Sequence, residues 1–85
     1  MKLKKEFITH MSGDEQLMIS AGGSFNGMVR SNKTAAFIID LLKEETTREA
    51  IVATMLDTYD ASEEIIAADV DKVIEALRGI GAIDE

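Results

Sequence analysis

The apolar residues of this 85-residue chain change their spacing near Asn32, and this change limits the folds open to it. Before Asn32, large aliphatic and β-branched residues come in short runs separated by glycine and polar turn residues, a pattern typical of strands. After Asn32 they recur three and four residues apart, a pattern typical of amphipathic helices. Strands followed by helices predict an α+β domain in which the sheet and the helices are segregated.

The first part of the chain predicts three strands. Residues 6–11 and residues 16–20 are strand-like runs, and the Ser-Gly-Asp-Glu sequence at residues 12–15 predicts a tight turn between them. Residues 21–27 contain three glycines and an Asn-Gly pair, which can adopt positive φ, so we expect a loop there. A short third strand is expected at residues 28–30.

Capping residues set the predicted starts of the first two helices. Asn32 can cap a first helix, which we expect to end near residues 43–45. Thr46 followed by Glu49 is a capping-box pattern, so we expect the Thr46 hydroxyl to accept from the N–H of Glu49 at the start of a second helix. The apolar stripe expected on this second helix comprises Ile51, Val52, Met55, Leu56 and Tyr59.

A third helix is expected to begin at a Ser62 cap and to end at Gly79. One face of it carries the apolar residues Ile66, Val70, Val73, Ile74 and Leu77. A chain of this size has room for one small core. We therefore expect a single domain over residues 1–85, with its strands within residues 5–31 and its helices within residues 32–79.

Charge is distributed unevenly along the chain, whose net charge is −7. Residues 1–30 carry four basic and three acidic side chains, whereas residues 31–85 carry five basic and thirteen acidic ones. Binding to nucleic acid depends on clustered Lys and Arg side chains that neutralise phosphates. Because the helical half of the chain repels phosphate, we expect no nucleic-acid partner.

The chain contains no cysteine, which excludes disulfides, thiolate metal sites and a cysteine nucleophile. Its basic start, residues 1–6, is not followed by an apolar run long enough for a signal peptide or a membrane span. These two features favour a reducing compartment. We expect a cytoplasmic protein with no membrane partner.

Residues that could carry catalysis or bind a metal are isolated from suitable partners. His10 is the sole histidine, and no Ser-His or Cys-His catalytic arrangement and no metal-ligand cluster is evident around it. Asp69 and Asp71 are two positions apart on a helix and so point in different directions. The glycine-rich residues 22–27 lack the Lys-Ser/Thr pair of a phosphate-binding loop. We therefore expect a protein that is not an enzyme and that uses no metal and no cofactor.

A three-stranded sheet leaves at least one edge whose backbone groups are unpaired, and an extended peptide can add to such an edge. We expect residues 28–30 to form that edge beside the last helix. The groove between them would have a floor made of Val73, Ala76 and Leu77. Asp69 and Lys72 would set specificity through charge. The apolar floor residues fit a core equally well, and the two charged residues fit a solvated surface.

A series of short motifs spans residues 30–83. It comprises the run at residues 30–36 with its Asn-x-Thr-Ala step, an apolar helix ending in Leu41-Leu42, residues 46–51, Tyr59-Asp60, residues 69–77, and a closing Leu-x-x-x-Gly-x-Ile segment at residues 77–83. In their order and spacing these motifs resemble the PqqD family, and the resemblance covers nearly the whole chain.

The resemblance implies a winged helix-turn-helix-like fold, with a three-stranded antiparallel sheet followed by three helices. It also implies a RiPP recognition element, which is a chaperone that binds the leader segment of a ribosomally synthesised precursor peptide. Such a domain delivers the peptide to a radical S-adenosylmethionine (SAM) enzyme or to the leader peptidase of a lasso-peptide pathway. The family takes its name from pyrroloquinoline quinone (PQQ) biosynthesis, but similar folds serve many peptide pathways.

The resemblance also implies a binding mode. In the family, the leader adds as a strand beside the third strand and lies against the third helix. Carried onto this sequence, the peptide-binding residues are Met28, Val29, Arg30, Asp69, Lys72, Val73 and Ala76, to which the groove floor adds Leu77. Val29→Pro, which removes a strand N–H, is then expected to weaken leader binding while the fold persists.

Two other functions fit parts of this pattern. Three helices beside a small sheet can form a winged-helix DNA-binding domain. The candidate recognition helix, residues 62–78, carries five acidic and two basic side chains, which repel phosphate. The other alternative is a general protein-interaction domain that has lost its peptide, and the sequence does not distinguish it from a leader-binding domain.

Overall fold

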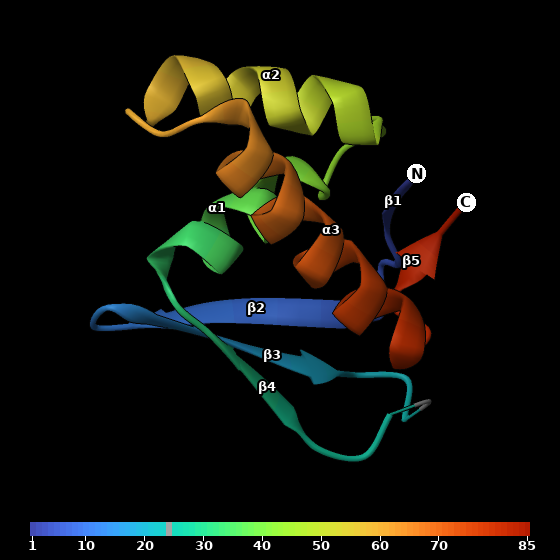
Figure 1. The fold of residues 1–85 in the computed structure, drawn as a ribbon. Helices are drawn as coiled ribbons and strands as arrows, with labels where there is room; N and C mark the ends of the chain where they lie inside the picture. Colours follow the sequence, from blue (N-terminus) through green and yellow to red (C-terminus); the bar gives the residue numbers. More distant parts are fainter. Residues whose placement is uncertain (24) are drawn as a thin grey trace.

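A three-stranded antiparallel sheet, in the order β2-β3-β4, forms one layer of the fold, and the three helices lie on one side of it (Figure 1). The computed structural model describes residues 1–23 and 25–85. Its elements are β1 (Lys2–Leu3), β2 (Phe7–Ser12), β3 (Glu15–Ser20), β4 (Met28–Ser31), α1 (Lys33–Leu41), α2 (Arg48–Thr58), α3 (Glu63–Gly79) and β5 (Ile83–Asp84). The expected order of three strands and three helices is observed.

The two terminal strands were not indicated by the sequence. β1 and β5 pair antiparallel, so the two ends of the chain lie side by side (Figure 1). They form a separate two-stranded sheet next to the helices. The strands therefore extend beyond residues 5–31, because the ends of the chain bond to each other.

The hairpin between β2 and β3 turns through two residues, as the sequence indicated. Gly13 and Asp14 connect Ser12 to Glu15, which are paired across the ladder. Gly13 has a φ of 64°, a conformation that glycine adopts without strain at the first position of a tight hairpin turn. The expected loop at residues 21–27 joins β3 to β4, and Ser24 within it lies outside the described residues.

Aliphatic side chains of the helices pack against one face of the sheet. Phe7 and Met18 point into this core and are only 5% and 1% exposed. Their sequence neighbours Ile8 and Ile19 point to the opposite face, because side chains alternate along a strand. The rest of the core is formed by Leu3, Ile38, Ile39, Leu42, Ile51, Val52, Met55, Ile66, Val70, Ile74, Leu77, Ala82 and Ile83. Within the described residues, no helix has the length and apolarity needed to cross a membrane.

The caps of α1 and α3 lie where the sequence placed them. The Asn32 side chain accepts from the N–H of Ala35 at 2.9 Å, and the Ser62 hydroxyl accepts from the N–H of Ile65 at 3.3 Å. Each of these bonds satisfies a backbone donor that the helix itself leaves unpaired.

The start of α2 differs from the prediction by one residue. Its cap is Thr47, whose hydroxyl accepts from the N–H of Ala50 at 3.1 Å, and not Thr46. The backbone of Thr46 is engaged elsewhere, because its N–H donates to the carbonyl of Met1 at 2.9 Å. This bond joins residues far apart in the sequence, so the local capping pattern does not reveal it.

α1 also ends before residues 43–45, where the sequence placed its end. Its last helical residue is Leu41. The next carbonyl, that of Leu42, accepts from the N–H of Leu3 in β1 at 2.7 Å. The N-terminal segment therefore satisfies a carbonyl at the end of this helix.

Leu56 does not belong to the core, although the apolar stripe of α2 predicted that it would. Its side chain is 37% exposed. The other members of the stripe do face inward, and Tyr59 packs edge-on against Phe37 with ring centroids 5.6 Å apart. The narrower stripe follows from the position of α2 at the outer side of the helical layer (Figure 1).

Candidate functional site: a groove between β4 and α3

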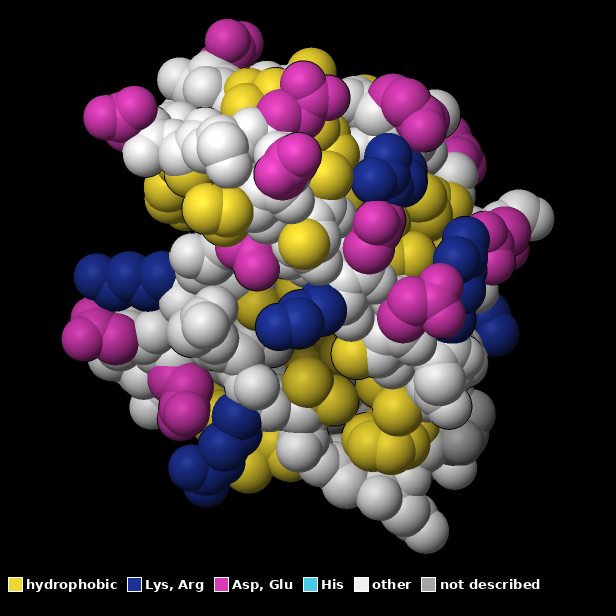
Figure 2. Space-filling view, in the orientation of Figure 1, with side chains coloured by type: hydrophobic (Ala, Val, Ile, Leu, Met, Phe, Trp, Pro, Cys, Tyr) yellow, Lys and Arg dark blue, Asp and Glu magenta, His cyan; other side chains and the backbone are white. Residues whose placement is uncertain are grey.

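A groove separates β4 from α3. Figure 2 shows hydrophobic side chains in the hollow between these elements, whereas many Asp and Glu side chains gather over the helices. The cavity in this groove has a volume of about 250 Å³. It is lined by Val29, Arg30, Ser31, Asn32, Ala35, Ile39, Lys72, Val73, Ala76 and Leu77. A strand, the start of α1 and the last half of α3 therefore meet at one place.

The hydrogen-bond pattern of the sheet decides which backbone groups of β4 are open. Bonded and non-bonded pairs alternate along an antiparallel ladder. Just beyond the last pair of β2 and β3, the N–H of Ala21 donates to the carbonyl of Glu6 at 2.7 Å. The pair of Glu6 and Ala21 is therefore a bonded one, and the bonded pairs recur at every second residue. Ile19, Leu17 and Glu15 of β3 consequently direct their backbone groups toward β2.

The residues between these direct their backbone toward β4. Met18 is one of them, and it lies opposite Val29. Val29 is therefore bonded within the sheet, while its neighbours Met28 and Arg30 direct their N–H and C=O groups toward the open edge. Val29→Pro would remove a bond inside the sheet rather than at its edge. Proline at Arg30 would remove an N–H at the edge itself. The structure therefore replaces Val29→Pro, the variant expected from the sequence, with Arg30→Pro as the test of the edge.

The floor of the groove consists of side chains from successive turns of α3. Leu77 is only 2% exposed, so it belongs to the core and also lines the cavity. Val73 is half-buried and packs against the core. Ala76 is exposed at the rim. The two interpretations of the apolar residues are therefore compatible, because one face of α3 serves both the core and the groove.

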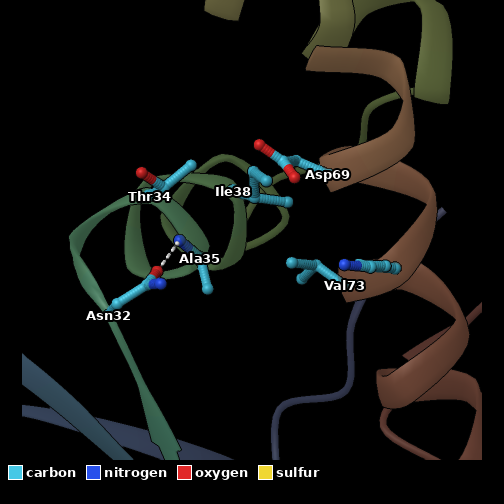
Figure 3. A pocket seen from close by; sticks show the side chains of 7 residues that line it. Asn32, Thr34, Ala35, Ile38, Asp69 and Val73 are labelled. Carbon is cyan, nitrogen blue, oxygen red and sulfur yellow. Dashed lines mark hydrogen bonds between the residues drawn. The ribbon is translucent and has the colours of Figure 1, made fainter. Parts of the chain in front are cut away.

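A second hollow of about 250 Å³ continues the groove toward the start of α1 (Figure 3). Asn32 and Ala35 line it from the side of α1, and Asp69 and Val73 point toward them from α3 (Figure 3). Lys72 lines both hollows. The groove is therefore apolar beside β4 and more polar beside the cap of α1.

Two charged side chains border the groove without a partner among the described residues. Asp69 and Lys72 form no ion pair with any residue that the structure describes. Asp71, in contrast, accepts from the Arg48 guanidinium through Nε at 2.5 Å and through Nη2 at 3.1 Å. These bonds lower the pKa of Asp71 and join α2 to α3. Asp71 is thus engaged in the fold, while Asp69 and Lys72 remain free for a ligand.

The structure brings together most of the residues that the sequence singled out for peptide binding. Those that line the two hollows are Val29, Arg30, Asp69, Lys72, Val73, Ala76 and Leu77. Met28 lines neither hollow, and its side chain is 47% exposed on the opposite face of the sheet. Arg30 lies two positions further along β4, so its side chain shares that face, where it pairs with Glu15 at 3.8 Å. The backbone of Met28 and Arg30 is therefore the part that lies at the open edge. The role of all these residues in binding stays a prediction.

The start of α1 is the part of the site that the sequence did not indicate. Ser31, Asn32, Ala35 and Ile39 line the groove, yet the spacing of the apolar residues assigned α1 only to the core. The Asn-x-Thr-Ala step was a usable signal, since Asn32 and Ala35 belong to it. Its contact with α3 depends on how the helices pack, which periodicity does not reveal.

The fold and the groove define a winged-helix-like α+β domain with an open strand edge beside its last helix. The family model described as "Coenzyme PQQ synthesis protein D (PqqD)" matches residues 15–83. The chain belongs to the PqqD family.

A solved structure has the same fold. It is described as "TbiB1 in Complex with the TbiA(beta) Leader Peptide", and it superposes with a TM-score of 0.79 at 19% sequence identity. The similarity covers 99% of this chain and 100% of the other. A search of curated proteins finds no match. At this identity the likeness establishes the winged helix-turn-helix-like fold.

Proposed function

We propose that this protein is a non-catalytic peptide chaperone, a RiPP recognition element that binds the leader segment of a ribosomally synthesised precursor peptide. The leader adds as a strand to β4 and is presented to a modifying enzyme, either a radical SAM enzyme or a lasso-type leader peptidase. The observation that carries this proposal is the open backbone of Met28 and Arg30 beside an apolar groove. Membership of the PqqD family and a solved relative with a bound leader support it.

Strand addition would give the complex its affinity. The N–H and C=O groups of Met28 and Arg30 lie along the edge where a peptide backbone would pair. Each backbone bond contributes about 1 kcal/mol net. The edge is short, since β4 has four residues, so the side chains of the peptide must supply the remaining affinity.

The groove would select those side chains by position. Residues directly opposite each other in a ladder share one face of the sheet. The peptide residue opposite Val29 would therefore point toward α3, into the cavity whose floor is Val73 and Leu77. The next inward-facing residue lies two positions away, where the ammonium group of Lys72 and the carboxylate of Asp69 both line the hollow. This geometry favours an apolar leader residue followed or preceded, two positions away, by a polar or charged one.

The rival functions fit the groove less well. A general protein-interaction domain would not require an apolar groove that runs along an open strand edge. DNA binding would need a cationic recognition helix, but α3 has free carboxylates, such as Asp69, at the groove. The proposal leaves the pathway open, because the family name does not require a role in PQQ biosynthesis.

Calorimetric titration of the domain with leader segments tests the proposal. The segments are those of precursor peptides encoded beside its gene, and scrambled peptides of the same composition are the controls. We expect one leader to bind with a dissociation constant in the micromolar range or tighter, while its scrambled form does not bind. A well-folded domain that binds none of the leaders would contradict the proposal.

A further inference from the structure

The face of the sheet that points away from the helices carries a row of exposed aliphatic side chains. Ile8 lies opposite Ile19, and Ile19 lies opposite Met28, so the three form one line across β2, β3 and β4. Their side chains are 51%, 47% and 47% exposed. An antiparallel sheet that faces only water normally has polar residues at such positions. Adjacent exposed aliphatic side chains are typical of an interaction site.

This aliphatic row ends beside a cluster of lysines. A hollow of about 320 Å³ at the β2 side of the sheet is lined by Ile8 together with Lys4, Lys5 and Lys43. Lys43 pairs with Asp40 at 3.0 Å, whereas Lys4 and Lys5 form no ion pair with any residue that the structure describes. In a chain of net charge −7, this hollow is a cationic site next to an apolar one.

We propose that the aliphatic row and the lysine hollow dock the enzyme that receives the peptide, through an apolar enzyme surface flanked by carboxylates. This inference rests on the proposed chaperone function. The charge of the lysines favours an acidic partner, and the aliphatic row favours one with exposed apolar side chains. The site is distinct from the peptide groove, which lies on the other face of the sheet and involves α3.

The size of the row and its position argue for this occupant over a second copy of the chain. With strands about 4.8 Å apart and a rise of about 3.3 Å per residue, three strands paired over four residues present a face of only about 200 Å². A stable dimer needs about 800 Å² from each partner. The row ends at Met28, whose backbone lies at the open edge, so an added peptide strand would continue this face. An enzyme docked here would contact chaperone and peptide together, and so bury more surface.

Two double variants and a control test this proposal without disturbing the groove. Ile8→Thr with Ile19→Thr removes the aliphatic row but keeps β-branched residues that suit a strand. Lys4→Glu with Lys5→Glu reverses the charge of the hollow. Ile65→Thr is the control, because Ile65 is 59% exposed at the start of α3, away from the sheet. Each protein is titrated first with the leader, and its leader complex is then titrated with the modifying enzymes encoded beside the gene.

We expect both double variants to bind the leader within about twofold of the wild type but the enzyme at least about tenfold more weakly, with Ile65→Thr unchanged. Unchanged enzyme affinity in both double variants would overturn the docking surface, as would a wild-type complex that binds none of these enzymes. The wild type could instead self-associate in sedimentation, or bind vesicles containing anionic phospholipid, while the double variants do neither. That result would overturn the proposal in favour of a second copy or a membrane. Failure to bind any leader would instead contradict the chaperone function itself.

Discussion

Met18 and Val29 face each other in the β3–β4 ladder as a hydrogen-bonded pair, and this relationship leaves the backbone of Arg30 open at the edge of the sheet. The proposed function therefore depends on the backbone at this edge. Arg30 lies next to the apolar groove, so a peptide paired with its backbone would be held against α3.

Proline substitutions distinguish the open edge from the interior of the sheet. Arg30→Pro removes an N–H that faces the edge, where strands tolerate proline, so the fold persists. We expect leader affinity to fall about tenfold relative to Arg30→Ala, which controls for loss of the side chain. Val29→Pro should instead destabilise the domain by about 1–3 kcal/mol, because it leaves a buried carbonyl of β3 unpaired. Urea unfolding and calorimetry separate the two effects, and equal leader affinity in Arg30→Pro and Arg30→Ala would argue against edge pairing.

Filling the groove should block the peptide without harming the core. Ala76 is exposed at the rim of the cavity, so Ala76→Phe changes stability by no more than about 0.5 kcal/mol. It should lower leader affinity at least about tenfold, since the ring occupies space that a leader side chain needs. Ala68→Phe is the matched control, because Ala68 is an exposed alanine of the same helix that lines neither hollow. If both variants bind the leader like the wild type, the cavity is not the peptide site.

The cap of α2 provides a test of the fold. Thr47→Ala removes the hydroxyl that accepts from the N–H of Ala50, and it should lower the free energy of unfolding by about 1 kcal/mol. Thr46→Ala should cost less than about 0.5 kcal/mol, because the bond from Thr46 to Met1 uses backbone atoms only. Urea titrations of the two variants measure the difference. If Thr46→Ala lowered the free energy of unfolding more than Thr47→Ala, the result would support Thr46 as the cap, as the sequence indicated.

The ion pair between Arg48 and Asp71 should make the stability of the domain depend on pH in the acidic range. Hydrogen bonds from Arg48 lower the pKa of Asp71 in the folded protein, whereas the unfolded carboxyl keeps its ordinary value of about 4. The stabilisation is therefore present above about pH 4 and is lost as the pH falls through the lowered pKa of the folded state. We expect Asp71→Asn to melt at a lower temperature than the wild type at pH 7, with a gap that narrows below pH 4. Thermal melts across this range measure the gap, and a gap independent of pH would exclude this contribution.

Short-range features of the fold could be predicted from the sequence. The turn at Gly13, the caps at Asn32 and Ser62 and the order of the elements follow from local chemistry, because each depends on residues within a few positions of one another. Long-range features could not. The residues at the end of α1 and before the start of α2 bond to the N-terminal segment: the carbonyl of Leu42 accepts from the N–H of Leu3, and the N–H of Thr46 donates to the carbonyl of Met1.

In the candidate site, too, local features could be predicted from the sequence and long-range ones could not. The last turns of α3 were identified because Val73 and Leu77 share one helical face. Asn32 and Ala35 were missed as groove residues because their contact with α3 is a matter of helix packing. The open backbone of Arg30 depends on the register of two ladders, and a shift of one residue would have exposed Val29 instead.

Amide hydrogen exchange of Arg30, followed by NMR with and without a leader peptide, tests the central claim most directly. In the free domain, the Arg30 amide should exchange faster than the amides of Val29 and Ser31, which are bonded to β3. Saturation with the leader should slow exchange at Arg30 at least about tenfold and leave the amides of β2 unchanged. A leader that binds while the Arg30 amide exchanges as fast as in the free domain would contradict strand addition at β4.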